Sequence, residues 1–318
     1  MSFKIDNIEI NGKVILAPMA GITSFSYRLF SKPFGCALVY SEMVSDCGLI
    51  YDNTRTKTLL LTNEVERPLA IQLFGGSKET LLKGIELLEK SGTKYDILDL
   101  NLACPVPKVT KGNSGSSWLK DLDAMEEMLK AVVRASSKPV SVKVRLGFNE
   151  NQIEEICKRV QKAGVKFIAI HARTKKELYG GEPHFDLLKN IRDILTIPFA
   201  VSGNIFSLEE AQKALEMTRA DAVMLARGAI GDPLLIKEIN ENIIIKRDYQ
   251  TQSKYLLEFA KLLIEEKGEE RAIGILKGIA PKFFKMFGDA KTLRQTLTTK
   301  MKSFNDLEEI INKELLLK

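Results

Sequence analysis

The chain has 318 residues, of which 45% are hydrophobic and 28% are charged, and it carries a net charge of +6. This is the composition of an ordinary globular protein, and the longest apolar runs fall well short of the roughly 18 residues that a membrane span needs. The four scattered cysteines and two histidines form no metal-ligand or disulfide pattern, so we expect neither a metal site nor a disulfide framework. The N-terminal segment has no apolar signal-peptide core, which predicts a cytoplasmic protein.

Eight apolar runs of strand length recur along the chain, with segments of helical periodicity between them. Their nearly continuous apolar character is expected of parallel strands that are covered on both faces. The predicted strands are Lys13–Met19, Ala37–Met43, Pro68–Phe74, Asp96–Leu102, Pro139–Leu146, Phe167–His171, Ile197–Ser202 and Asp221–Ala226. The clearest predicted helices are Lys78–Lys90, Asp121–Ala135, Asn151–Lys162 and Ser207–Met217, with Ser77, Asp121, Asn149 and Ser207 as candidate caps.

Eight strand–helix units in roughly 230 residues predict an α/β fold, a (β/α)8 TIM barrel, over residues 1–240. A doubly wound sheet is the alternative, but no GxGxxG motif follows the first strand. After about Asn240 the strand signal ends, and residues 252–317 have helical periodicity. We therefore predict a second unit, a small α-helical bundle, over residues 241–318.

The carboxyl ends of the predicted strands carry the candidate functional side chains, as is usual in TIM barrels. The small residues 17–21 follow the first strand and allow a flat ligand to approach the backbone closely. Lys143 and Arg145 alternate on the fifth strand, so both face the barrel mouth. Two cations in an apolar strand are costly unless an anionic or polar ligand meets them, and a structural ion pair at Lys143 is the alternative. The other strand-end candidates are Gln72, Asn101, His171, Arg173, Tyr179, Ser202, Gly203, Asn204, Ala226 and Arg227.

Cys104 is the most informative single residue, because it stands where the fourth predicted strand ends. A free cysteine is usually a small core residue. Here, however, Asn101 supplies a donor and an acceptor nearby, and Pro105 ends the pairing of the strand. A loop with Lys108 and Lys111 follows. We therefore predict that Cys104 is functional.

One polar group at each strand end suits a phosphorylated, planar, redox-active cofactor better than a metal or a sugar. TIM barrels often hold a phosphate at the loops after the seventh and eighth strands, where Arg227 is an available donor. Gln72 and Lys143 would then bond the polar edge of the ring, where a cation also stabilises the anionic reduced form. We predict FMN in this position, with Cys104 beside it as an acid.

A local block of positive charge lies between Arg271 and Lys302, where eight basic residues accompany a single acid, Asp289. Such a block indicates a polyanionic partner, although a solvated helix face is the simpler alternative. The candidate contacts in this block are Lys282, Lys285, Lys291 and Arg294.

Taken together, these segments resemble the tRNA-dihydrouridine synthases, and most nearly their bacterial B type. The similarity runs in the same order from about Lys13 to Pro233, and the Cys-Pro motif with its following lysines is its most specific part. The matching segments are APMAG at 17–21, QLFGG at 72–76, NLACPVPKV at 101–109, VKVRLG at 142–147, HARTKKELYGG at 171–181, SGNIFSLEEA at 202–211 and ARGAIGDP at 226–233.

The resemblance implies an enzyme that uses FMN and NADPH to reduce D-loop uridines of tRNA to 5,6-dihydrouridine. It implies hydride transfer from the reduced flavin to C6 of the uracil and proton transfer from Cys104 to C5, on a base flipped out of the tRNA. The implied FMN contacts are Pro18, Met19, Ala20, Gln72, Lys143, His171, Ser202, Gly203, Asn204, Ala226 and Arg227. The implied uracil contacts are Asn101, Arg145 and Tyr179. The other predicted substrate contacts are Arg173, Lys108 and Lys111 together with Lys282, Lys285, Lys291 and Arg294 of the basic block.

The chain departs from the family pattern at a few cofactor and loop positions. Ala103 and Ala226 stand where glycine is usual, and Ser202-Gly203-Asn204 replaces Asn-Gly-Asp. Two other interpretations remain open. A dihydroorotate dehydrogenase-like FMN barrel acting on a free pyrimidine would not need the basic block, and an RNA-binding barrel without activity would not need Cys104. We expect a monomer, and the choice of NADPH is implied by the resemblance alone.

Overall fold

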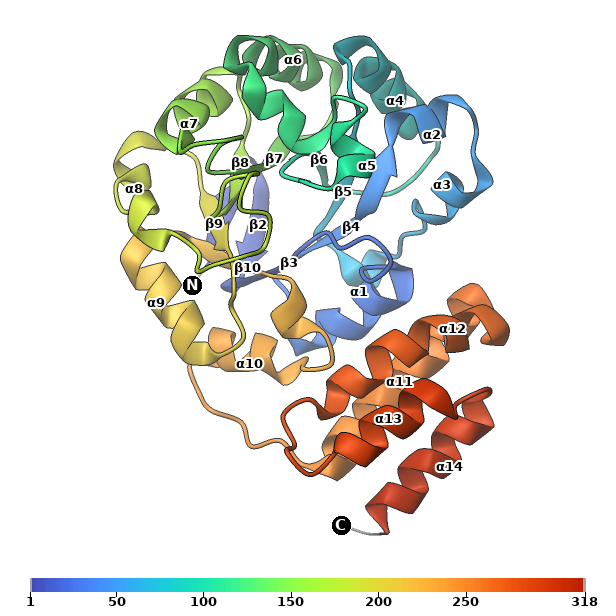
Figure 1. Cartoon of the computed structure of the whole chain (residues 1–318). Coiled ribbons are helices and arrows are strands. Elements are labelled where there is room, and N and C mark those ends of the chain that lie inside the picture. Colours follow the sequence, from blue (N-terminus) through green and yellow to red (C-terminus); the bar gives the residue numbers. More distant parts are fainter. Residues whose placement is uncertain (1, 317–318) are drawn as a thin grey trace.

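The computed structural model describes residues 2–316 and contains eight parallel strands in a closed barrel (Figure 1). The strands follow one another around the barrel in chain order, and the eighth, β10, pairs with the first, β3. The predicted (β/α)8 barrel is therefore confirmed. The barrel strands are β3 (Val14–Leu16), β4 (Leu38–Ser45), β5 (Leu69–Phe74), β6 (Ile97–Leu102), β7 (Val140–Arg145), β8 (Phe167–His171), β9 (Phe199–Ser202) and β10 (Ala222–Leu225).

The register of the barrel strands brings the polar strand residues to similar levels. Gln72 pairs with Asp99, and Lys143 pairs with Asn101. His171 pairs with Arg145 on one side and with Ser202 on the other. Apolar residues dominate the rest of the strands and are buried on both faces, as the continuous apolar runs predict.

Helices surround the barrel, and the four that the sequence indicates most clearly are present as α4, α6, α7 and α9. Ser77, Asp121 and Ser207 cap three of them by accepting backbone N–H hydrogen bonds. The cap predicted at Asn149 is wrong, because the carbonyl oxygen of the Asn151 side chain accepts from the N–H of the first residue of α7. The barrel helices are α1 (Phe25–Ser31), α2 (Asp46–Ile50), α3 (Thr54–Thr58), α4 (Lys78–Lys90), α5 (Pro107–Thr110), α6 (Leu122–Ala135), α7 (Ile153–Lys162), α8 (Ile191–Ile194), α9 (Leu208–Thr218) and α10 (Leu234–Glu241).

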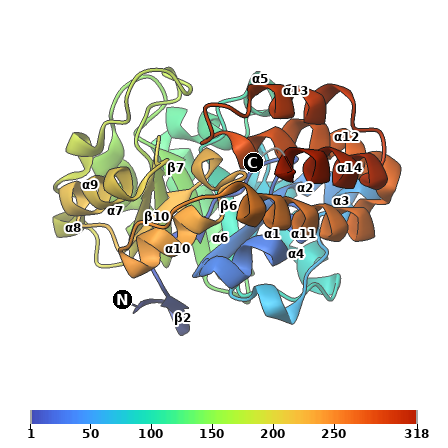
Figure 2. The same cartoon turned by 90° about the horizontal axis from the view of Figure 1, so that it is seen from below.

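A hairpin that the sequence did not indicate closes the amino-terminal end of the barrel. It consists of β1 (Ser2–Ile5) and β2 (Ile8–Asn11), and Figure 2 shows it on the side of the molecule opposite α5. Ile5 and Ile10 are fully buried in the cluster that fills this end. The ring of Phe3 stacks on Phe167, the first residue of β8, with a centroid distance of 6.1 Å. The carboxyl ends of the strands are therefore at the other, open end.

A helical region follows the barrel and packs against α1. The ring of Phe259 lies 5.4 Å from that of Tyr27 and 5.5 Å from that of Phe30, and Phe283 lies 6.0 Å from Phe30. Gly231, with φ +73°, approaches this region so closely that a Cβ there would be 2.3 Å from the carbonyl carbon of Lys282. The helices of the region are α11 (Tyr249–Lys267), α12 (Glu269–Ile279), α13 (Lys291–Thr299) and α14 (Phe304–Leu315), with a 3-10 turn at Ala280–Phe284; position 317 of the predicted helical segment lies outside the described residues.

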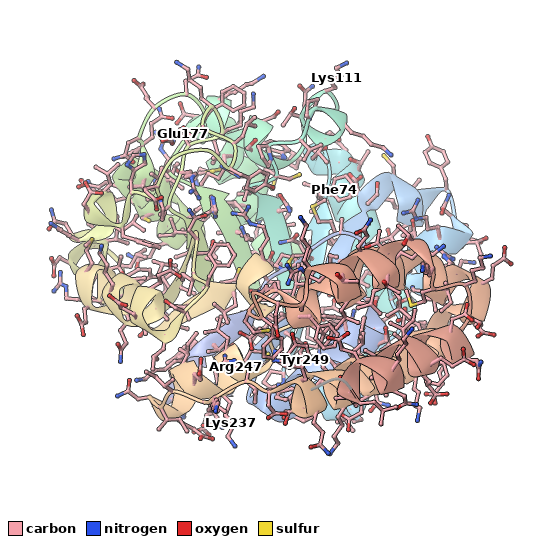
Figure 3. The ribbon with its side chains drawn as sticks, turned by 60° about the horizontal axis from the view of Figure 1, so that its bottom comes forward. Phe74, Lys111, Glu177, Lys237, Arg247 and Tyr249 are labelled. Atoms are coloured by element: carbon pink, nitrogen blue, oxygen red, sulfur yellow. The ribbon has the colours of Figure 1, made fainter. Side chains whose placement is uncertain are left out.

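Salt bridges hold the segment between the barrel and α11 in place. The guanidinium of Arg247 donates to both carboxylate oxygens of Asp232, each at 3.1 Å, and to the carboxylate of Glu238. Figure 3 shows Arg247 and Tyr249 next to each other at the start of the helical region. None of the helices within residues 2–316 is both long and apolar enough to cross a membrane.

A second, fully buried ion pair supports the loop after β3. Arg28 of α1 donates from Nε to Glu66 Oε2 at 2.6 Å, and it also donates to the backbone carbonyls of Leu61 at 2.7 Å and Thr23 at 3.1 Å. The hydroxyl oxygen of Thr23 in turn accepts the N–H of Met19 at 2.8 Å. The pair thus joins α1, the segment before β5 and the strand end at residues 17–20 into one unit.

Candidate active site

A cavity of about 350 Å³ lies at the carboxyl ends of the barrel strands. TIM-barrel enzymes place their active sites at this end. The cavity brings together predicted site residues from six of the strands and the loops that follow them. These are Pro18, Met19, Ala20, Asn101, Cys104, Lys143, Arg145, His171, Tyr179, Ser202, Gly203, Asn204, Ala226 and Arg227.

The lining of the cavity is positively charged. Lys143, Arg145 and Arg227 contribute cations, and none of the described residues around the cavity contributes a carboxylate. Burial and the nearby Arg145 lower the pKa of Lys143 to about 8, so its amine is charged at neutral pH but readily titrated. Such a lining favours a ligand that carries negative charge.

Arg145 is held in place by backbone carbonyls rather than by a carboxylate. Its Nε donates to the carbonyl of Ala103 at 2.8 Å, and its Nη1 donates to the carbonyls of Thr174 at 2.8 Å and Leu178 at 2.7 Å. The guanidinium also lies over the ring of Tyr179, 5.2 Å from its centroid. Arg145 therefore fixes the loops after β6 and β8 to each other at the mouth.

His171 is neutral, and its partners define its tautomer. Burial and the surrounding cations lower its pKa well below the usual value. Nε2 lies 3.5 Å from Nη1 of Arg173, and Nδ1 lies 3.2 Å from Oγ of Ser202. Because arginine can only donate, Nε2 is the acceptor and Nδ1 carries the proton that it gives to Ser202. The Ser202 hydroxyl proton is then free to point into the cavity.

Cys104 lines the cavity as a protonated thiol. Burial raises its pKa above the usual value, and this effect exceeds the opposing influence of Lys143 and Arg145. The Cys104 backbone is fixed on both sides, because its N–H donates to Asn101 Oδ1 at 2.8 Å and its carbonyl accepts from Ser116 Oγ at 2.9 Å. Gly115 has φ +60°, and a Cβ there would lie 2.8 Å from the Cys104 carbonyl oxygen, so this turn requires glycine.

A buried polar network lies beneath the cavity and contains a residue that the sequence analysis missed. Gln72 is fully buried and does not line the cavity; its amide instead bonds Asp99 and Asn101. Asp99 is fully buried, and its pKa is raised to about 7 by that burial. The alternation of Asp99 with Asn101 in the apolar strand β6 was the available signal. Arg173 also lies just outside the cavity, where it donates to the carbonyls of Gly180 and Gly181.

Several apolar lining residues also escaped the sequence analysis. Met43, Ile205, Phe206 and Met224 surround the cavity, and Arg227 lies over the Phe206 ring. Apolar residues at strand ends look like core residues in a sequence, so no signal separated them from the rest of the barrel interior.

The predicted tRNA contacts fall into two groups. Lys108, Lys111, Lys282 and Lys291 are exposed, and Figure 3 shows Lys111 extending outward just after the end of α5. Lys285 is exposed as well, but its ammonium donates to the carbonyls of Gly228 at 3.2 Å and Ile230 at 3.3 Å, which joins the helical region to the loop after β10. Arg294 donates to the carbonyls of Phe284 at 2.9 Å and Phe287 at 2.8 Å.

The fold and the cavity define a TIM-barrel enzyme whose reaction takes place at the carboxyl ends of the strands. The positive lining and the protonated thiol identify the chemistry that the cavity offers, namely binding of an anion and donation of a proton. Among residues 2–316, no group of histidine, cysteine, aspartate and glutamate side chains is arranged to hold a metal ion.

Comparison with known proteins identifies the family of TIM-barrel enzymes to which the chain belongs. A family model described as dihydrouridine synthase matches residues 15–315. A probable tRNA-dihydrouridine synthase of Aquifex aeolicus is 33% identical over 84% of this chain and 88% of its own length. The tRNA-dihydrouridine synthase B of Vibrio vulnificus is 34% identical over 74% of each chain. The chain therefore belongs to the dihydrouridine synthase family, and the resemblance found in the sequence is confirmed.

Solved structures with the same fold are more distant in sequence. The old yellow enzyme homologue from Zymomonas mobilis matches with a TM-score of 0.55 at 12% identity, covering 79% of this chain and 94% of that chain. At this level of identity the match shows a shared barrel fold.

Proposed function

We propose that this protein uses FMN and NADPH to reduce specific D-loop uridines of tRNA to 5,6-dihydrouridine. The observation that carries the proposal is a protonated cysteine, Cys104, in a cavity whose charged lining residues are all cations. The printed names of the relatives, tRNA-dihydrouridine synthases, support the choice of tRNA as substrate.

The residues of the cavity fit FMN, which carries a phosphate and a flat ring with one polar edge. Arg227 and the loop at Ser202–Asn204 would hold the phosphate; Nη2 of Arg227 already lies 3.1 Å from Asn204 Oδ1. Lys143 has no carboxylate partner within the cavity and would meet the polar edge of the ring, with His171 next to it. The small residues Pro18, Met19, Ala20 and Ala226 leave room for the ring system. When bound, FMN would carry the hydride that NADPH provides.

The role of Cys104 is to donate a proton. Saturating the C5–C6 bond of uracil requires a hydride at C6 and a proton at C5. The Cys104 thiol gives its proton to C5 and becomes a thiolate, which regains a proton from water at the open mouth of the cavity. NADPH is oxidised to NADP⁺, so two electrons and two hydrogens are accounted for. Burial keeps the thiol protonated at neutral pH, as this role requires.

Arg145 and Tyr179 would hold the flipped uracil; the amide of Asn101, the third predicted uracil contact, is already engaged by Gln72 and the Cys104 N–H. All three line the cavity, and Tyr179 is half exposed at its rim. The exposed lysines Lys108, Lys111, Lys282 and Lys291 would bind tRNA phosphates around the mouth and on the helical region.

Mapping dihydrouridine position by position in tRNA tests the proposal. Cells that lack the gene are complemented with the wild type, with Cys104→Ala or with Cys47→Ala, which removes an exposed free thiol away from the cavity. We expect dihydrouridine to return at defined D-loop positions with the wild type and with Cys47→Ala, but not with Cys104→Ala. A protein that binds flavin yet leaves the tRNA unchanged would favour a free pyrimidine as substrate.

A further inference from the structure

Asp99 is a buried carboxylate that ends a chain of hydrogen bonds beginning at Cys104. The carboxylate is fully buried in the middle of β6 and does not line the cavity. It accepts Nε2 of Gln72 at 2.6 Å on one oxygen and the hydroxyl of Ser141 at 2.5 Å on the other. Because an ionised carboxylate can only accept, both neighbours must present their protons to it.

The orientation of the two amides follows from this acceptor. Gln72 turns its NH2 group toward Asp99, so its Oε1 is left to accept Nδ2 of Asn101 at 2.8 Å. Asn101 then presents Oδ1 to the backbone N–H of Cys104 at 2.8 Å. Every link donates in the same direction, from Cys104 through Asn101 and Gln72 to Asp99. Gln72 and Asp99 are fully buried and Asn101 is only 6% exposed, so a missing hydrogen bond in this series leaves a polar atom with little access to water.

We propose that Asp99 is a positioning residue for Cys104, which acts through Gln72 and Asn101 to hold the loop that carries the thiol at the edge of the cavity. This inference rests on the proposed function in one respect, namely that the thiol is the proton donor. The hydrogen-bond chain itself is independent of the substrate.

The charged groups around Asp99 are consistent with a role in hydrogen bonding rather than in charge alone. Burial raises the pKa of Asp99, and Lys143 of β7 is the cation that opposes this rise. Tyr40 of β4 is the other titratable side chain that faces Asp99. If Asp99 becomes protonated, the carboxyl can still accept from Gln72 with its carbonyl oxygen while its proton goes to Ser141, which can accept. The chain toward Cys104 therefore persists in either protonation state.

Alkylation of Cys104 in the FMN-loaded protein tests this inference without tRNA or NADPH. The rate of modification by iodoacetamide is followed on the Cys104 peptide by mass spectrometry at several pH values. Asp99→Leu removes the acceptor for Gln72 while keeping the branched shape of the side chain. We expect it to raise the rate at Cys104 by about fivefold to tenfold, the effect of one lost buried hydrogen bond on loop opening.

Two further variants distinguish the effect of losing the hydrogen-bond chain from the effect of losing the negative charge of Asp99. Asp99→Asn keeps an acceptor for Gln72 and should restore the wild-type rate. Ser141→Ala removes the other partner of Asp99, lies outside the chain and should change the rate less than about twofold. If Asp99→Leu does not fold, Gln72→Leu cuts the same chain one link nearer to Cys104 and should give the faster rate.

The outcomes are distinct. A folded Asp99→Leu or Gln72→Leu protein that is modified at the wild-type rate overturns the inference. So does an Asp99→Asn protein that reacts as fast as Asp99→Leu, because charge would then be the cause. If the wild type fails to reduce tRNA while the labelling follows the expected pattern, the proposed function fails and the positioning role stands.

Discussion

Replacing Glu66 by glutamine should destabilise the protein strongly. The Glu66 carboxylate accepts Nε of Arg28 at 2.6 Å and Nη2 at 3.3 Å, and both side chains are almost completely buried. Glutamine keeps the shape but leaves the guanidinium without a counter-charge. Removing one partner of a buried ion pair costs about 3–5 kcal/mol, a large part of the roughly 5–15 kcal/mol that native proteins have.

Urea unfolding followed by circular dichroism at neutral pH measures this effect. The matched control is Glu64→Gln, since Glu64 pairs with Arg67 at 3.0 Å but is 73% exposed, so its loss should cost less than about 1 kcal/mol. The reasoning is refuted if Glu66→Gln lowers the free energy of unfolding no more than the control does. That result would mean that the carbonyls of Leu61 and Thr23 satisfy Arg28 without the carboxylate.

Three further predictions concern the helical region and the cavity. Gly231→Ala should lower the melting temperature more than Gly268→Ala. The φ angles are similar, +73° and +77°, but only at Gly231 would the new Cβ meet another segment, 2.3 Å from the carbonyl carbon of Lys282. Equal shifts in thermal unfolding would contradict this. Lys291→Gln should reduce the slope of log affinity for tRNA against log salt by about 1, whereas Lys285→Gln should leave the slope unchanged, because Lys285 is engaged with two carbonyls; a filter-binding titration decides. Lys143 is a cation below its pKa of about 8, so the affinity for FMN should weaken as the pH rises above 8, by at most tenfold per pH unit. Flavin fluorescence measures the affinity, and its pH dependence should vanish in Lys143→Met.

Most of the barrel was predictable because its strands are continuous apolar runs that repeat at regular intervals. Seven of the eight predicted strand ranges contain the observed strand, and β4 continues two residues further, to Ser45. The hairpin β1–β2 was not predictable in this way. Its strands have four residues each and alternate with polar side chains, and the turn depends on Asp6 in a left-handed conformation with φ 56°.

The site was predictable where the position of a residue on a strand fixes the direction of its side chain. It was less predictable where contacts with residues distant in the sequence determine that direction. The alternation of Lys143 and Arg145 correctly indicated that both side chains reach the mouth. Gln72, also near a strand end, is turned into the barrel wall because Asp99 lies beside it. Lys285 and Arg294 belong to a basic segment of the sequence, but the carbonyls that they bind come from folded loops that sequence spacing does not reveal.

The packing of α11 on α1 has a consequence for synthesis of the chain. Tyr27 and Phe30 emerge from the ribosome early, whereas Phe259 and Phe283, which cover them, are made only after the last barrel strand. Until then the nascent barrel presents an uncovered aromatic face on its first β/α unit, a surface that chaperones bind and that promotes aggregation. A fragment truncated at residue 240 would keep that face permanently exposed, so we expect it to aggregate more readily than the full chain.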